Sequence, residues 1–270
     1  MSPIYESDGN YYGVSWAYEG SLAGSSYVFQ VTPAGAFTKI ADLPNESFTT
    51  GNPGSFLQAD DGNFYGTTSG ANPAGTGIGT LYQVTPSGQY ALIYSFGKGA
   101  GSTPGKTLQG SDGNFYGVTK GSAGPTSYGE IFQLTKTGQY TALYQTNSKS
   151  GFCPCWIMQG SDGQLWGTTD AGGAGGGGTI FALDAGLPKP VPRALSFSPS
   201  VGNAGTTKVR IWGYNLLAAS VQFNGVAAAE VHNAGPNYAW ATVPAGATTG
   251  PITVTTPGGA STTTAPFTVK

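Results

Sequence analysis

The stretch SDGNFYGVT, residues 111–119, is one of four closely related segments in this chain. The others are SDGNYYGVS at 7–15, DDGNFYGTT at 60–68 and SDGQLWGTT at 161–169. Aspartate can hydrogen-bond the backbone ahead of it, and Gly and Asn tolerate a positive φ, so each segment predicts a tight turn leading into a strand. A glycine in the middle of each strand predicts a close backbone approach or a bulge. The four copies therefore predict one hairpin built four times.

A second motif follows each hairpin segment. It reads VFQVTPAG at 28–35, LYQVTPSG at 81–88 and IFQLTKTG at 131–138, and it shortens to IFALDAG at 180–186. After the first three copies comes an alternating segment: AFTKIADL, QYALIYSF or QYTALYQT. Each unit of about 50 residues thus contains four strands, but the last unit contains three. Such units predict an all-β chain that begins with a four-unit β-propeller, whose last blade is one strand short.

The combined pattern, LQGSDGNFYGVT followed by IFQLT and GQYT, resembles the GloVer-type tandem repeat of secreted bacterial proteins. The resemblance covers about residues 2–186. It implies a propeller-like fold and a location outside the cell, and it implies little about activity.

The repeat pattern stops at residue 186, and the Pro-rich segment LPKPVP at 187–192 predicts a semi-rigid linker. Short alternating strands joined by Gly, Pro and Asn turns then predict a β-sandwich over 193–270. The segments SPSVGNAGTTKVRIWGYNL, VQFNG, ATVPAGATTGPITVTTPGG and PFTV resemble the IPT/TIG immunoglobulin-like domain. The expected domains are therefore a propeller at 1–186, a linker at 187–192 and an Ig-like sandwich at 193–270.

The charge and composition of the chain indicate which classes of partner are not expected. The formal net charge is −2, and the 11 Lys and Arg residues do not cluster, so we expect no nucleic-acid partner. No apolar run approaches the roughly 18 residues of a membrane span. No basic segment followed by an apolar one is visible in MSPIYESDG. The low charge and abundant Gly, Ser, Thr, Asn and Tyr favour an extracellular or cell-surface protein.

Few residues suggest catalysis or metal binding. We expect the recurring aspartates to hold turns, and Asp60 with Asp61 forms the best candidate calcium site. No other cofactor is expected. Cys153 and Cys155 are too few for a zinc site, and they predict either a tight local disulfide or two thiols packed in a loop. The only histidine, His232, lies outside the repeats, so a Ser–His–Asp triad is not expected there.

A binding site is best sought where the copies differ. Residues that follow the recurring Tyr-Gly step would lie at matching places around one rim of the propeller. An aromatic ring beside polar groups at such a rim would suit a sugar. The candidate ligand-binding residues are Trp16, Tyr18, Glu19, Ser69, Lys120 and Asp170.

The missing strand leaves an exposed edge in the last unit, which is a template for strand pairing. The edge is either tolerated, covered by a segment of the sandwich, or completed by a neighbouring molecule. The leading hypothesis is a non-enzymatic structural or adhesion protein that self-associates into fibres by completing this edge, with Asn45 as a glycosylation acceptor. A carbohydrate-binding module using the rim is the alternative, and a glycan-active enzyme is the third hypothesis.

Overall fold

The computed structural model describes residues 4–5, 9–15, 26–43, 53–71, 78–97, 101–121 and 128–270. Every regular element in this part of the chain is a β-strand, so the all-β prediction is confirmed. The chain forms two compact units, one made of Met1–Met158 and Leu165–Ala185, the other of Gln159–Gln164 and Gly186–Lys270. Each unit is described by itself below.

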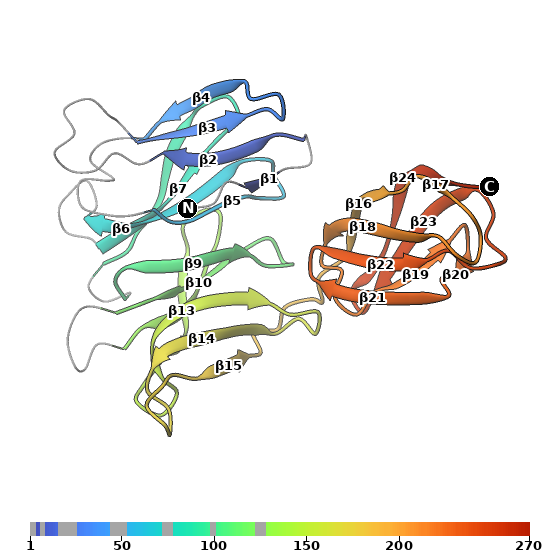
Figure 1. The fold of residues 1–270 in the computed structure, drawn as a ribbon. Helices are drawn as coiled ribbons and strands as arrows, with labels where there is room; N and C mark the ends of the chain where they lie inside the picture. The colour runs from blue at the N-terminus through green and yellow to red at the C-terminus, as the bar shows by residue number, and fades with distance from the viewer. Residues whose placement is uncertain are drawn as a thin grey trace. The chain divides into compact units, whose positions relative to one another are not determined.

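Among the described residues the first unit contains four sheets, and in each the strands follow chain order. Figure 1 shows the first sheet, from β1 to β4, in blue. The first sheet consists of β1 (Ile4–Tyr5), β2 (Tyr11–Ser15), β3 (Tyr27–Val31) and β4 (Phe37–Asp42). The second consists of β5 (Pro53–Gln58), β6 (Phe64–Ala71), β7 (Ile78–Val84) and β8 (Tyr90–Ser95). The third consists of β9 (Pro104–Gln109), β10 (Phe115–Thr119), β11 (Glu130–Leu134) and β12 (Tyr140–Gln145). The fourth has three described strands, β13 (Phe152–Gln159), β14 (Leu165–Ala171) and β15 (Ile180–Leu183).

The repeated turn joins the first two strands of its sheet. In the third sheet Asp112 Oδ1 accepts the N–H of Asn114 at 3.1 Å, and Gly113 has a φ of 84°, a conformation that favours glycine. Asp61 and Asp162 make the same bond to the N–H two residues ahead, each at 3.0 Å. The turn therefore holds itself by local bonds, which explains why its residues recur.

The mid-strand glycine makes room for an aromatic ring. Gly117 pairs with Phe132 across β10 and β11, and a Cβ at Gly117 would lie 2.4 Å from the Phe132 ring. The same close approach joins the other three pairs, which are Gly13 with Phe29, Gly66 with Tyr82, and Gly167 with Phe181. The glycine thus marks a close approach, as expected, and the approaching group is a cross-strand ring.

Consecutive sheets share apolar cores. Tyr12 and Val28 of the first sheet pack with Phe64 and Tyr82 of the second in one buried cluster. A second cluster joins Tyr65 and Leu81 of the second sheet with Phe115, Phe132 and Leu134 of the third. The sheets therefore stack in chain order, from blue to yellow in Figure 1.

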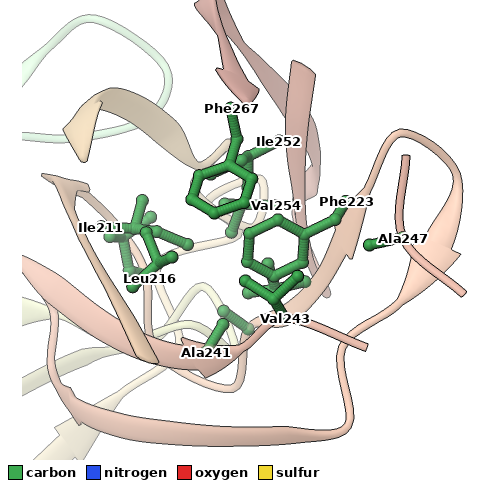
Figure 2. Packing of buried hydrophobic residues seen from close by; sticks show 12 residues of the cluster. Ile211, Leu216, Phe223, Ala241, Val243, Ala247, Ile252, Val254 and Phe267 are labelled. Atoms are coloured by element: carbon green, nitrogen blue, oxygen red, sulfur yellow. The ribbon is translucent and has the colours of Figure 1, made fainter. Parts of the chain in front are cut away.

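The second unit contains two sheets around one core. One sheet consists of β16 (Arg193–Ser198), β18 (Lys208–Tyr214), β22 (Tyr238–Thr242) and β21 (Glu230–Gly235). The other consists of β17 (Val201–Gly202), β24 (Gly259–Val269), β23 (Gly250–Thr256), β19 (Ser220–Phe223) and β20 (Val226–Ala227). Alternate residues of β18 are buried, and Ile211 meets Phe223, Ile252 and Phe267 from the opposite sheet (Figure 2). One face of each sheet is therefore buried in this core.

Candidate functional site

The open edge of β15 is the first candidate site. Phe181 is equivalent to Phe132, because each opposes the mid-strand glycine of its own sheet. In the third sheet β11 pairs with β12 on its other side, whereas the fourth sheet ends at β15 among the described residues. The backbone edge of β15 is consequently available for strand pairing.

A pocket lies beside this edge. Its volume is about 220 Å³. The third sheet supplies two walls, through the buried Ile131 and the exposed ring of Tyr144, and β15 supplies Phe181, Ala182 and Leu183. The remaining lining residues are Thr146 and Ser150. Because these walls are mostly apolar, the pocket suits a hydrophobic side chain.

The preceding sheets show what fills the equivalent space. Tyr140, the first residue of β12, stacks on Phe132 with ring centroids 5.6 Å apart and on Tyr94 at 5.1 Å. Phe181 is the equivalent of Phe132, and Tyr144 is the equivalent of Tyr94, since both tyrosines oppose the same position of the third strand. The pocket therefore corresponds to the place of an aromatic residue at the start of a fourth strand. We call it the aromatic socket.

The candidate calcium ligands are engaged with protein groups. The Lys136 ammonium pairs with the Asp60 carboxylate and lies 3.3 Å from Asp61 Oδ2. Hydrogen bonds from Lys136 and Gln109 lower the pKa of Asp60. Burial opposes ionisation of Asp61, but bonds from the Asn63 N–H, the Tyr65 hydroxyl and Lys136 outweigh it, so this pKa is lowered too. In the described part of the chain, no three His, Cys, Asp or Glu side chains gather as a metal site.

The six rim candidates are only partly placed. Trp16, Tyr18 and Glu19 lie outside the described residues, as does the glycosylation candidate Asn45. Ser69 belongs to β6, but its side chain is not described. The other two candidates, Lys120 and Asp170, both influence the pKa of the Cys155 thiol. Burial and the hydrogen bond with Asp170 raise the pKa of that thiol, while Lys120 acts in the opposite direction.

Of the two predicted alternatives, the structure shows two free thiols and no disulfide between Cys153 and Cys155, and both residues lie in β13 rather than in a loop. An extended strand separates residues two apart by about 6.6 Å, at the far end of the range that a disulfide bridges. The Cys155 Sγ instead lies 3.3 Å from the Thr168 hydroxyl on the neighbouring strand.

An aromatic cluster on the second unit was missed in the sequence. The Arg210 guanidinium carbon lies 4.2 Å from the ring centroid of Tyr238, 5.0 Å from that of Trp212 and 5.5 Å from that of Trp240. Arg210 Nε is buried and has no hydrogen-bond partner among the described residues. The alternation in KVRIW and YAWAT could have revealed the cluster, because it places these side chains on the sheet face opposite the core.

No helix in the described part of the chain is long and apolar enough to span a membrane.

Comparison with known proteins gives one family. A family model described as "Gloeobacter/Verrucomicrobia repeat" matches residues 1–226. No curated protein matches the chain. The assignment of residues 193–270 to an IPT/TIG domain stays a prediction.

Similar solved structures are remote. An α-L-arabinofuranosidase from Clostridium thermocellum ATCC 27405 is 12% identical, with a TM-score of 0.42 over 69% of this chain and 72% of that one. The calcium-binding protein regucalcin from Agrobacterium tumefaciens str. C58 is 12% identical, with a TM-score of 0.42 over 89% and 88%. A protein of unknown function from Bacteroides thetaiotaomicron VPI-5482 is 14% identical, with a TM-score of 0.42 over 96% of this chain but only 57% of that one. Likenesses this weak carry no argument about activity.

Proposed function

We propose that this chain, which belongs to the Gloeobacter/Verrucomicrobia repeat family, is a non-enzymatic structural or adhesion protein that self-associates outside the cell. In this proposal the first unit consists of four β-propeller blades that follow one another without closing into a ring, and its last blade is incomplete. The second unit is an Ig-like domain of the IPT/TIG type. A strand from a second copy completes the fourth sheet. The assembly that results is a fibre, with Asn45 as a site for a glycan.

The aromatic socket is the observation that carries this proposal. It combines a strand edge that pairs with no further strand among the described residues with a side-chain pocket. The edge would supply main-chain hydrogen bonds, and the pocket would supply selectivity. Strand addition to a sheet edge uses this combination. The socket also specifies the incoming strand, because the fourth strands of the complete sheets all begin with an aromatic residue: Phe37, Tyr90 or Tyr140.

The described carboxylates support a structural role rather than catalysis. Glu130 is buried and accepts a hydrogen bond from the Tyr140 hydroxyl at 2.7 Å, and Asp42 pairs with Lys39 at 2.8 Å. Asp61 and Asp112 hold turns. A glycan-active enzyme remains the third hypothesis, and it requires two carboxylates about 5 to 9.5 Å apart across one bond.

A peptide tests the edge. A fluorescently labelled peptide of residues 138–145, GQYTALYQ, is expected to bind the protein saturably in an anisotropy titration, because it carries the strand that completes the third sheet. The same peptide with Tyr140→Ala is expected to bind on the order of tenfold more weakly, since the socket then stays empty.

The matched protein variants are Tyr144→Lys, which changes a socket wall, and Leu92→Lys, which changes a similarly exposed residue of β8 away from the socket. Only Tyr144→Lys should weaken peptide binding and fibre formation in electron micrographs. Equal binding of both peptides, or fibres that persist in Tyr144→Lys, would reject completion of the edge.

The Arg210 cluster favours carbohydrate binding as a second candidate function. Flat rings stack on the apolar faces of sugars, and a guanidinium donates hydrogen bonds to hydroxyl groups. Trp212 and Trp240 are both partly exposed on the same sheet face as Arg210. This location differs from the rim expected from the sequence.

A glycan array tests this second candidate. The wild-type protein is expected to bind at least one glycan class, and Trp240→Ala to weaken that binding roughly tenfold or more by removing a stacking ring. Val201→Ala, at a similarly exposed residue of β17, is the control. Absence of glycan binding by the wild-type protein, or equal binding by Trp240→Ala, would remove the candidate.

A further inference from the structure

The two ends of the sheet stack expose different apolar faces. The leading face belongs to the first sheet and consists of Tyr11, Phe29, Val31 and Phe37. The trailing face belongs to the fourth sheet and consists of Trp166, Ile180 and Ala182. Tyr11 is 41% exposed and Phe37 56% on the leading face, while Ile180 is 79% exposed and Trp166 39% on the trailing face. Monomeric soluble proteins rarely leave large apolar patches uncovered.

Inside the stack the equivalent residues are buried. Phe64 and Phe115 correspond to Tyr11 by their pairing with the third strand, and both are 0% exposed. Leu81 and Ile131 correspond to Ile180, and they are 1% and 2% exposed. Most positions of the terminal faces are therefore positions that the repeat buries wherever a neighbouring sheet is present.

The interfaces within the stack show how such faces fit. The Tyr65 ring, at the position of Trp166, packs against Phe115 with centroids 4.4 Å apart. One repeat earlier, the Tyr12 and Phe64 rings make the same contact at 4.6 Å. In both cases the trailing face of one sheet meets the leading face of the next. A leading face is thus the natural complement of a trailing face.

The fourth copy also lacks a tyrosine–glutamine hydrogen bond that the earlier copies form on their trailing faces. In the earlier copies a glutamine Nε2 donates to a tyrosine hydroxyl, as Gln133 does to Tyr116 at 2.6 Å and Gln83 to Tyr65 at 2.7 Å. In the fourth copy the tyrosine is Trp166 and the glutamine is Ala182. Neither replacement can form this Tyr–Gln hydrogen bond, because alanine is apolar and Trp166 carries a mainly apolar indole ring, although this face is the more exposed one. Such a change favours burial against another apolar surface.

We propose that the trailing face of one copy packs against the leading face of a second copy, in the same relation as consecutive sheets within the chain. The contact rests on the self-association proposed above, but it uses sheet faces rather than the β15 edge. Because the two faces differ, the contact is head-to-tail, and it generates either a closed ring or an open filament.

Single-face variants test the proposal by size-exclusion chromatography with light scattering. Tyr11→Lys places a charge on the leading face, and Ile180→Lys places one on the trailing face. Each variant alone is expected to associate on the order of tenfold or more weakly than wild type, because a lysine would be buried without a partner. Leu92→Lys, 43% exposed on β8 of an interior sheet, is expected to assemble as wild type.

Mixing the two variants gives the sharper result. Tyr11→Lys keeps an intact trailing face and Ile180→Lys an intact leading face, so an equimolar mixture is expected to form a 1:1 dimer and nothing longer. Phe37→Lys and Trp166→Lys are second variants of the two faces if the first fail to fold by circular dichroism. Trp166 lies on β14, which is paired on both sides, so this variant leaves the edge strand unaltered.

The outcomes separate the two contacts. A wild-type protein that stays monomeric at high concentration, face variants that assemble like wild type, or a mixture that forms no dimer would each overturn the face contact. Peptide binding at the socket together with normal assembly of the face variants would retain edge completion alone. If the peptide does not bind but the mixture of Tyr11→Lys and Ile180→Lys forms a dimer, only the face contact is retained.

Discussion

Replacing Phe132 with alanine is expected to lower the free energy of unfolding by about 3 to 5 kcal/mol, the range for losing a fully buried phenylalanine. Phe132 is 0% exposed, and its ring covers Gly117, stacks on Tyr140 and meets Phe96 edge-on at 5.2 Å. Neither Gly117 nor the fixed neighbouring rings can expand to fill the space. Denaturant unfolding followed by circular dichroism measures the change.

Phe181→Ala is the matched control within the same chain. Phe181 covers Gly167 as Phe132 covers Gly117, but it is only half-buried and lines the aromatic socket. Because this ring lacks a fourth strand beside it, its removal from the monomer is expected to cost roughly half as much as Phe132→Ala. Equal losses at the two positions would mean that the fourth sheet packs as tightly as the third, and the socket would not exist as a space.

The sequence predicts the local parts of this fold well. The Asp-Gly turn at Asp112 and the glycine at Gly117 each depend on residues within their own hairpin, so their pattern repeats wherever the hairpin repeats. The shortened last unit is likewise a difference between copies, and the structure describes three strands there. Repetition makes such features visible without knowledge of the tertiary fold.

Contacts between hairpins are less accessible to sequence reasoning. Tyr144 lines a socket only because the sheet after its own lacks a strand, and nothing in QYTALYQT indicates this. Arg210 meets Tyr238 because β18 pairs with β22, a partner 28 positions further along the chain. Cys153 and Cys155 lie in β13 rather than in a loop, because this strand accommodates Pro154 between them, and Cys153 has a φ of 55°.

Alkaline pH is expected to destabilise the protein steeply, because two repeated tyrosines are held in the protonated form. Burial raises the pKa of both Tyr65 and Tyr116 to about 12, and each also donates a hydrogen bond to an aspartate, Asp61 or Asp112. Burial raises the pKa of Tyr82 as well, and burial together with Glu130 raises that of Tyr140. The folded chain therefore retains these protons at a pH where an unfolded chain loses them.

The direction of the change in stability with pH follows from proton linkage. A tyrosine in the unfolded chain ionises near its ordinary value of 10.0, whereas the pKa of Tyr65 and of Tyr116 is about 12 in the folded chain. The contribution of these two tyrosines to the free energy of unfolding is fully present below pH 10 and is lost as the pH rises through 12. Denaturant midpoints measured from pH 8 to pH 12 should thus fall above pH 10. A flat profile between pH 10 and pH 12 would contradict the assignment.

Phenylalanine variants identify the residues responsible for the alkaline loss. Tyr116→Phe removes one titrating hydroxyl, so the fall in stability above pH 10 is expected to be shallower than in wild type. At neutral pH the same variant loses about 1 to 3 kcal/mol, because Gln133 and Asp112 lose a partner. Leu92→Ala, at an exposed residue of β8 that carries no titrating group, should keep the wild-type slope. If Tyr116→Phe keeps that slope too, the alkaline loss arises elsewhere, since the hydroxyl that the repeat holds between Asp112 and Gln133 would then ionise equally in folded and unfolded chains.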